Sequence, residues 1–262
     1  MNINEIEKRL NKNVKIIIHE ELPSTNTEAK NLALNGETEF TTVIAKRQTR
    51  GKGRLGRSFM SNSETGLYMS IILKPEISPH KCVDITVMVA SAVLEAINET
   101  SGVLPSIKWV NDIYINDKKV CGILVESTCE NDKITNAIVG IGVNITPPQG
   151  GFDSEIKDIA TSIFGENAPI NYKEILCAQI INKIIYYYEN FDDKTYMSVY
   201  RKNSNIINEE VDIYVGNEIV RGIAIDINDK AEIVIKTENG DIRVFNSGEA
   251  RVRKGGAKLS EK

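Results

Sequence analysis

The stretch best suited to chemistry is AKRQTRGKGRLGRS, residues 45–58, which holds six basic residues, three glycines and no acid. Glycines let backbone amides approach an anion closely, and guanidinium groups donate charge-assisted hydrogen bonds to phosphate or carboxylate oxygens. The whole chain carries a formal net charge of −4, so positive charge is concentrated locally here. The segment predicts an anion site, and the alternative is a solvated basic loop without a ligand.

Two generic phosphate motifs compete for the same letters. Gly51, Gly53 and Gly56 have the spacing of the dinucleotide fingerprint, and Gly51 with Gly56 is one residue short of a P-loop. The residues that follow do not open a helix, and no acid ends a next strand about twenty residues further on. Arg57 also stands where a P-loop has its lysine. We therefore expect neither a Rossmann site nor a P-loop.

A second group of polar residues lies in IKWVNDIYINDKKVCGILVE, residues 107–126. Lys108, Trp109, Asn111 and Asp112 stand at a predicted strand end, and a hairpin brings Lys119 back beside them. Polar groups among apolar strands cost free energy unless each is paired or used. The segment predicts a reaction centre, with a charged hairpin tip as the alternative.

A third signal is VGIGVNI, residues 139–145, where Gly140 and Gly142 interrupt a strand of mainly β-branched residues. Glycine inside a buried strand indicates close approach by a ligand or by another backbone. Plain close packing is the alternative.

The elements that must position these residues follow from hydrophobic periodicity and turn signals. A capping box at 25–28 opens a helix that ends near Gly36, and Gly102 stops a second helix. Short alternating strands after residue 205 predict a small β-barrel of about fifty residues. We expect strands at 14–19, 41–48, 67–73, 107–114, 119–127 and 134–144, helices at 80–100 and 172–189, and barrel strands at 211–215, 219–226, 232–236 and 241–245.

These elements predict an α+β fold, in which a mixed β-sheet is backed by helices and followed by the small barrel. The expected domains are residues 1–204, the catalytic part, and residues 205–262, the barrel with a frayed tail from residue 253. The loop at 49–66 is too long for a simple hairpin turn.

Several classes of protein are excluded. The longest apolar stretch, residues 87–94, is far shorter than the roughly 18 to 20 residues that cross a bilayer, and the charged N-terminus is no secretory signal. We expect a cytoplasmic protein that binds no membrane. The four cysteines include no CxxC pair and have no neighbouring histidines, so we expect no metal site and no disulfide.

The ordered motifs resemble those of biotin–protein ligases. GKGRLGRSF is similar to their GRGRxGRxW loop, and KWVNDIYINDKKVCGILVE is similar to their KWPND and KxxGxLxE segment. STN at 24–26 and GxGxN at 140–144 stand at the expected places, so the resemblance covers residues 14–253. It implies a catalytic domain like that of class II synthetases, followed by an SH3-like β-barrel.

The resemblance also implies an ATP-dependent ligase that works in two steps. Biotin reacts with Mg²⁺-ATP to give biotinyl-5′-adenylate, and a carrier lysine then displaces AMP. The implied partner is the biotin carboxyl carrier domain of a carboxylase such as acetyl-CoA carboxylase, and the protein would be a monomer or homodimer. Because STN begins at residue 24, no room precedes it for the family's helix-turn-helix domain, so we expect no nucleic-acid binding.

Matching by motif assigns the site residues. The catalytic residues would be Lys119 at the carboxylate and acyl phosphate, Asp112 orienting the incoming lysine or a metal ion, and Arg54 in the loop. Phe59 would pack against adenine. Biotin would be bound by Ser24, Thr25, Asn26, Gln48, Lys52, Gly53, Arg54, Lys119, Gly122, Gly140 and Gly142, and the nucleotide by Gly51, Arg54, Arg57, Phe59, Asn111, Asp112, Lys119 and Asn144.

Three residues depart from the family pattern. Lys52 replaces an arginine and loses its planar fork, Phe59 replaces tryptophan and reduces the stacking area, and Val110 replaces proline. Two other functions stay open: a lipoate or octanoate ligase or transferase, and a non-catalytic biotin-binding regulatory module. Retention of Arg54, Arg57, Asp112 and Lys119 favours an active enzyme, and the full GKGRLGR loop favours biotin.

Overall fold

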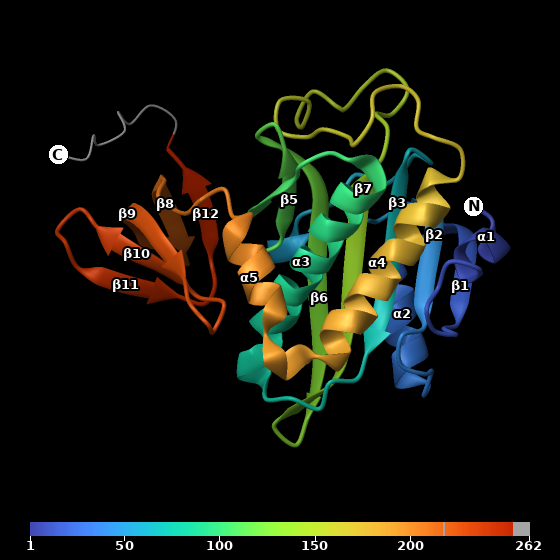
Figure 1. Cartoon of the computed structure of the whole chain (residues 1–262), viewed down its shortest axis with the longest axis horizontal. Coiled ribbons are helices and arrows are strands. Elements are labelled where there is room, and N and C mark those ends of the chain that lie inside the picture. Colours follow the sequence, from blue (N-terminus) through green and yellow to red (C-terminus); the bar gives the residue numbers. More distant parts are fainter. Residues whose placement is uncertain (217, 254–262) are drawn as a thin grey trace.

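The computed structural model describes residues 1–216 and 218–253. A seven-stranded sheet in the order β1-β2-β3-β7-β6-β5-β4 is followed by a five-stranded sheet in the order β11-β10-β9-β8-β12 (Figure 1). In the large sheet, β1 and β2 are parallel and all other neighbours are antiparallel, so the predicted mixed sheet is confirmed. The tail predicted to fray lies outside the described residues beyond Arg253.

The bounds of the elements are as follows. The large sheet contains β1 (Ile16–Leu22), β2 (Thr42–Gln48), β3 (Gly66–Leu73), β4 (Ser106–Lys108), β5 (Asp112–Ile115), β6 (Lys118–Glu130) and β7 (Lys133–Asn144). The helices are α1 (Ile3–Glu7), α2 (Thr25–Leu34), α3 (Cys82–Ser101), α4 (Tyr172–Glu189) and α5 (Thr195–Lys202). The second sheet, here called the C-terminal sheet, contains β8 (Glu210–Val215), β9 (Glu218–Ile227), β10 (Ile233–Thr237), β11 (Ile242–Phe245) and β12 (Glu249–Val252).

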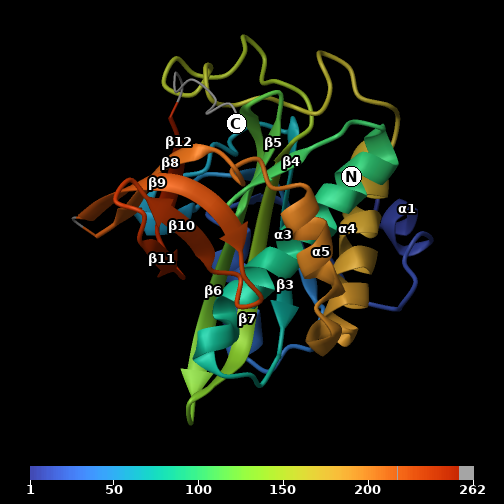
Figure 2. The ribbon, with the colours of Figure 1, turned by 60° about the vertical axis from the view of Figure 1, so that its left-hand side comes forward.

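Helices cover both faces of the large sheet. α3 and α4 pack on one face and α5 packs against α3 (Figure 2), whereas α2 covers the other face. Strand β3 is buried throughout, because successive side chains point to opposite faces and both faces are covered. Leu67 and Met69 join the main core, whereas Ile72 packs with Ala29 and Ala33 of α2. Helix α2 therefore packs on the face of the sheet opposite to α3 and α4, and its first residues lie against that face.

The segment predicted as one strand at 107–114 is two strands. β4 and β5 form a hairpin in which Lys108 pairs with Asp112, and the connecting residues Trp109, Val110 and Asn111 are buried. The turn consists of buried residues and contains no glycine or proline, so no turn signal marks the reversal of the chain. The prediction of three antiparallel strands between 107 and 144 was therefore wrong by one strand.

The C-terminal sheet is attached to the large sheet through the same turn. The Trp109 Nε1 donates a hydrogen bond to the carbonyl oxygen of Ala231 at 3.1 Å, and both residues are buried. The Tyr200 hydroxyl of α5 donates to the carbonyl oxygen of Val110 at 3.0 Å. One continuous apolar cluster includes residues from both sheets. The two sheets therefore pack as one body.

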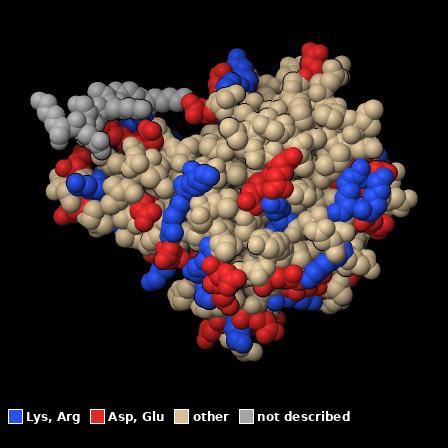
Figure 3. Space-filling model, in the orientation of Figure 1, with Lys and Arg blue, Asp and Glu red and all other residues tan. Residues whose placement is uncertain are grey.

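Charged side chains of both signs are interspersed on the face shown in Figure 3. Within the described residues, no helix is long and apolar enough to cross a membrane.

Candidate active site

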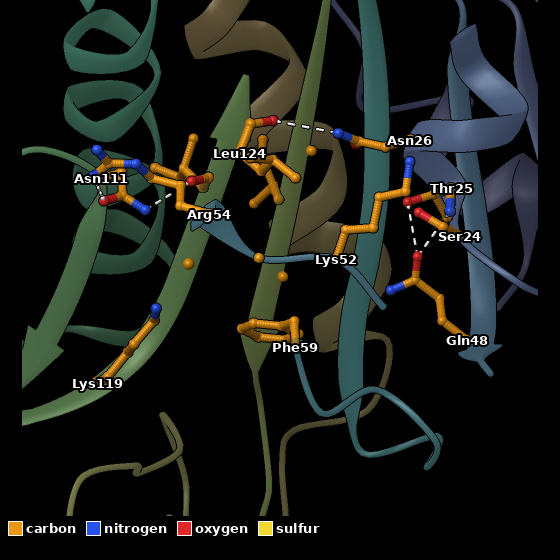
Figure 4. Close-up of a pocket in the computed structure, with 16 residues that line it drawn as sticks. Ser24, Thr25, Asn26, Gln48, Lys52, Arg54, Phe59, Asn111, Lys119 and Leu124 are labelled. Atoms are coloured by element: carbon orange, nitrogen blue, oxygen red, sulfur yellow. Dashed lines mark hydrogen bonds between the residues drawn. The ribbon is translucent and has the colours of Figure 1, made fainter. Parts of the chain in front are cut away.

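A pocket, here called the inner pocket, lies on the α2 face of the large sheet (Figure 4). Its wall comes from the start of α2, the end of β2, the loop at 49–66 that follows it, here called the basic loop, and strands β6 and β7. Every residue that the resemblance assigned to biotin lines it: Ser24, Thr25, Asn26, Gln48, Lys52, Gly53, Arg54, Lys119, Gly122, Gly140 and Gly142. Segments from four parts of the chain thus meet in one cavity.

The Gln48 side chain is fixed by hydrogen bonds at both ends of its amide. Its Oε1 accepts from the backbone N–H of Thr25 at 2.8 Å and from the Thr25 hydroxyl at 3.2 Å. Its Nε2 donates to the Ser61 hydroxyl at 3.1 Å. A buried amide with two fixed partners presents one defined edge to a ligand.

The predicted capping box at the start of α2 is wrong. The N-cap is Ser24, whose side chain makes no capping hydrogen bond, and the Thr25 hydroxyl is bonded to Gln48 instead. Thr25 is the first residue of the helix, where its side chain lies in the pocket wall. The polar residues at 24–26 therefore serve the cavity.

Asn26 is also held in one orientation. Its Oδ1 accepts from the Ser70 hydroxyl at 2.6 Å, and its Nδ2 donates to Oε2 of Glu126 at 2.8 Å. A Cβ built on Gly140 would lie only 2.1 Å from the Asn26 Oδ1. Gly140 is therefore required by the side chain of Asn26.

Gly142 makes room for an aromatic ring. A Cβ on Gly142 would lie 2.5 Å from the Phe59 ring, and one on Gly122 would lie 3.2 Å from it. The sequence predicted that glycines in β7 mark close approach by a ligand or another backbone. The groups that approach are side chains, Asn26 and Phe59. Phe59 thus lies in the wall of the inner pocket, and its predicted contact with adenine stays a prediction.

The basic loop folds on itself. Lys52 and Ser58 form a β-bridge, the Gly53 N–H donates to the Arg57 carbonyl at 2.7 Å, and the Phe59 N–H donates to the Gly51 carbonyl at 2.9 Å. The sequence suggested a loop too long for a simple hairpin turn, but its central residues form a compact hairpin. Its backbone geometry is set by local hydrogen bonds.

The basic residues of the segment 45–58 do not all serve one site. Lys46 and Arg47 belong to β2, where they pair with Glu20 and Glu21 at 2.8 and 3.5 Å. The cations that line the pockets come from the loop beyond β2. The interpretation of all six as one anion site was therefore too broad.

A second cavity, here called the outer pocket, lies between the loop, the β4–β5 hairpin and the C-terminal sheet. Of the residues that the resemblance assigned to the nucleotide, it is lined by Arg54, Arg57, Phe59, Asn111, Asp112 and Lys119. Arg54, Phe59, Asn111 and Lys119 also line the inner pocket. The two cavities therefore meet at these four side chains.

Two predicted nucleotide residues lie elsewhere. Gly51 lines a neighbouring groove along the loop. The Asn144 Nδ2 donates to the Thr161 carbonyl at 3.0 Å, and Asn144 is absent from the described walls of both pockets. Asn144 thus lies outside the described walls of the two pockets, and its place on the nucleotide side stays a prediction.

An ion pair and a hydrogen bond from a guanidinium group lie at the junction of the pockets. The Lys119 Nζ lies 2.8 Å from Oδ1 of Asp112, and the Arg54 Nη1 donates to Oδ1 of Asn111 at 2.7 Å. In the outer pocket, burial lowers the pKa of the Lys108 ammonium. Burial likewise raises the pKa of the neighbouring Tyr114 to about 12. The cavity is thus a partly desolvated place in which charge interactions are strong.

Several residues of the site were missed from sequence. Ser70 was detectable, because it is the single polar side chain between Tyr68 and Leu73 in an otherwise apolar strand. Glu126 lies at the end of a quoted motif but gave no sign of its bond to Asn26. Gly248 and Glu249 line the outer pocket from the C-terminal sheet, and no local pattern links them to the loop.

Comparisons with known proteins agree with this geometry. Residues 19–144 match the Biotin/lipoate A/B protein ligase family, and residues 206–253 match the Biotin protein ligase C terminal domain. The protein named Bifunctional ligase/repressor BirA from Bacillus subtilis is 33% identical over 240 residues, which cover 88% of this chain and 72% of that protein. The Biotin--[acetyl-CoA-carboxylase] ligase of Paracoccus denitrificans is 33% identical over 124 residues, 47% of this chain and 51% of that protein.

A solved structure extends the match to the fold. Biotin protein ligase from Aquifex aeolicus in complex with biotin and ATP superimposes with a TM-score of 0.74 at 29% identity, covering 92% of this chain and 99% of that chain. The order of the motifs, the paired sheets and these matches lead to one assignment. The chain belongs to the biotin–protein ligase family.

Proposed function

We propose that this chain is a biotin–[biotin carboxyl carrier protein] ligase, which forms biotinyl-5′-adenylate from biotin and ATP and transfers biotin to a carrier lysine. The observation that carries the proposal is the meeting of two pockets at Arg54, Asn111 and Lys119. The inner pocket has fixed amide and hydroxyl groups at one end, and the outer pocket has four cations beside two carboxylates. Such a pair suits a neutral polar ring with an acid tail on one side and a polyphosphate on the other.

The polar end of the inner pocket would bind the ureido ring. Gln48 and Asn26 are held by the hydroxyls of Thr25, Ser61 and Ser70, so their free edges are already oriented. Pre-oriented donors and acceptors favour a ligand that matches them and reject one that leaves them unpaired. The proposed biotin site rests on this fixed network.

The first chemical step joins two anions. A carboxylate oxygen of biotin attacks the α-phosphorus of ATP, the bond to the bridging oxygen breaks, and pyrophosphate leaves. Positive charge must offset the repulsion and stabilise the charge that builds on phosphorus. Lys119 and Arg54 stand where the pockets meet, so we assign them this role, with Arg57 and the Gly51 backbone on the phosphate side.

The second step transfers the acyl group. The carrier's lysine amine attacks the carbonyl carbon of the mixed anhydride, and AMP leaves with the bonding electron pair. Asp112, beside Lys119, is the carboxylate that would orient the amine and accept its proton. Phe59 would then separate the tail of biotin from solvent, and its contact with adenine remains part of the proposal.

Magnesium is written here as part of the substrate. Among the described residues, no group of three or more His, Cys, Asp or Glu side chains is placed to hold a metal ion. Mg²⁺ commonly binds through one or two carboxylates together with substrate phosphates, and Asp112 in the outer pocket fits that pattern. We propose that the ion arrives with ATP and contacts Asp112.

The remaining assignments concern the whole protein. We propose residues 1–204 as the catalytic domain and 205–262 as the barrel domain, because the second family match begins at residue 206. The proposed partner is a biotin carboxyl carrier domain, the proposed oligomeric state is a monomer or homodimer, and the proposed location is the cytoplasm. Asn144 is proposed on the nucleotide side on the motif alone.

Incubation with biotin, Mg²⁺-ATP and a carrier domain, followed by intact-mass measurement, tests the function. We expect one biotinyl group on the carrier and none when its target lysine is replaced by arginine. Titration with biotin and with lipoate by calorimetry tests the ligand, and selective binding of lipoate would overturn the assignment. If the protein forms no biotinyl-adenylate from biotin and Mg²⁺-ATP in the absence of a carrier, the proposed enzymatic function is wrong.

A further inference from the structure

The C-terminal sheet contacts the basic loop at the start of strand β12. Oε2 of Glu249 lies 2.6 Å from the Arg57 Nη2, and the Gly248 carbonyl accepts from the Arg54 Nη2 at 3.4 Å. These residues line the outer pocket together with Lys108 and Asp112. The ion pair therefore joins the basic loop to the C-terminal sheet at the place where the two enclose the outer pocket.

The position of Glu249 is fixed from its own side. Within the C-terminal sheet it pairs with Tyr214 of β8, and its Oε1 lies 3.1 Å from the Arg251 Nε. Burial acts to raise the pKa of Glu249. The hydrogen bonds from Arg57 and Arg251 outweigh this effect and hold the pKa below its usual range. Glu249 is therefore a charged acceptor at neutral pH, on a rigid strand.

The preceding residue has little freedom. Gly248 has a φ of +135°, and a Cβ there would lie 2.8 Å from the Tyr214 carbonyl. The sheet that carries it is pinned to the hairpin of the reaction centre by Trp109 and Ala231. The strand end that contacts the loop is thus set by the same turn that sets Asn111 and Asp112.

The loop side of the contact is less constrained. The Arg57 side chain is 61% exposed, and the segment around it joins the large sheet through the Arg54 bond to Asn111 and the packing of Phe59 beside Gly142, while its backbone hydrogen bonds are internal. Such a segment can open locally without unfolding the domain. A charged bond from a fixed strand then limits how often it opens.

We propose that Glu249 is a positioning residue, which latches the basic loop over the outer pocket through Arg57 and so retains the reactive acyl-adenylate until a carrier lysine arrives. The purpose of the latch rests on the proposed function, but its effect on the opening of the loop can be measured without substrates. It gives the C-terminal sheet a role inside the reaction cycle. The latch would act on escape of the intermediate, not on the chemistry that forms it.

The size of the effect is bounded by the exposure of the pair. Partly exposed ion pairs contribute modestly to stability, so loss of this one should raise the open population of the loop by about two- to fivefold. Salt screens such pairs, so the difference between wild type and variant should shrink at high ionic strength.

The test compares Glu249→Gln with a matched control, Glu218→Gln. Glu218 pairs with Arg243 on the same sheet and lines a surface groove formed by β9 to β11. Hydrogen–deuterium exchange of residues 51–59, without ligands, should be about two- to fivefold faster in Glu249→Gln and unchanged in Glu218→Gln. Equal exchange in all three proteins would overturn the latch, whether or not the enzyme makes biotinyl-adenylate.

The functional arm measures escape of the intermediate. With biotin and ATP but no carrier, Glu249→Gln should release more biotinyl-adenylate and label more lysines of an unrelated protein such as serum albumin, by the same factor. The equilibrium affinity for biotin alone should not change, and Glu249→Asp should be intermediate. If loop exchange rises while escape stays at the wild-type level, the loop is latched but the latch does not retain the intermediate, and the retention role is wrong.

Discussion

Lys119 Nζ lies 2.8 Å from Oδ1 of Asp112 although the two residues are not paired in the sheet. Asp112 pairs with Gly122 of β6, and Lys119 pairs with Tyr114 of β5, with an irregularity between Ile113 and Tyr114. Because glycine has no side chain opposite Asp112, the Lys119 side chain can extend over that space. The ammonium is thereby held at the junction of the inner and outer pockets.

Replacement of Lys119 should therefore abolish the first step. In Lys119→Ala, biotin-dependent release of pyrophosphate should fall by about 100-fold or more, as is usual when a charged stabiliser of a transition state is removed. The matched control is Lys118→Ala, whose Nζ contacts the Lys157 carbonyl at the surface. A wild-type rate in Lys119→Ala would remove this residue from the reaction centre.

Replacement of Arg54 should make the enzyme leak. Arg54→Gly loses the bonds to Asn111 and Gly248 together, so the loop should detach from both walls of the outer pocket and release the acyl-adenylate. Labelling of unrelated lysines, read by streptavidin blot, should exceed that of Glu249→Gln, which loses the Arg57 contact but keeps both bonds of Arg54. A variant that remains strictly selective would argue against sequestration by the loop.

The need for glycine in β7 can be tested by a double-mutant cycle. Gly142→Ala places a methyl group 2.5 Å from the Phe59 ring, so biotin affinity should fall by about tenfold or more as the ring is displaced. Phe59→Ala should relieve the clash. The double variant should therefore lose less free energy of biotin binding than the sum of the losses of the two single variants. Gly165→Ala, which meets no atom within 4 Å, is the control. If the two single losses of binding free energy simply add in the double variant, Gly142 does not serve to make room for the Phe59 ring.

Glu126 should influence biotin binding without touching the ring. Its Oε2 orients the Asn26 amide, and its Oε1 lies 3.7 Å from the Lys52 Nζ. Glu126→Gln makes the bond to Asn26 neutral and allows the amide to flip, so biotin affinity should fall by about three- to tenfold in calorimetry. Glu189→Gln, at an exposed pair with Lys12, should bind as wild type does. Unchanged affinity in Glu126→Gln would mean that Ser70 alone orients Asn26.

Lys108 should make stability depend on pH in the alkaline range. Burial lowers its pKa in the folded state below the unfolded value, so the unfolded chain binds more protons between the two values. Stability from this residue should therefore rise as pH increases through that window, up to about pH 10.4. Lys108→Met should flatten the rise in the urea midpoint as the pH approaches about 10.4 from below, whereas Lys230→Met, at an exposed position, should not. An identical pH slope in Lys108→Met would show that the burial has no energetic consequence.

Long, strongly patterned elements were predictable from sequence, and contacts between distant elements were not. Helix α4 has the predicted bounds, because it is 18 residues long and Leu176, Ile180 and Ile184 repeat on one face. Helix α5 and strand β12 were missed, since eight and four residues are too few for a clear period. The hairpin at Trp109 was predicted as one straight strand, because its turn is made of buried residues and gives no turn signal in the sequence.

The site was predictable to the extent that motifs bring residues together. The residues expected at biotin line one pocket because four short segments carry them in order. Asn26, Ser70 and Glu126 illustrate the limit. Their bonds join three elements far apart in the chain, and a hydrogen bond between distant segments leaves no periodic trace in the sequence.

Through the indole of Trp109, the packing of each sheet depends on the presence of the other. If the chain were cut after residue 204, the buried Nε1–H would lose the Ala231 carbonyl, and the apolar cluster shared by the two sheets would lose the side chains of the C-terminal sheet. A C-terminal sheet taken from a relative would have to present a carbonyl at the same point to replace it. The small sheet is therefore a poor candidate for modular exchange, even where the cut point looks like a clean linker.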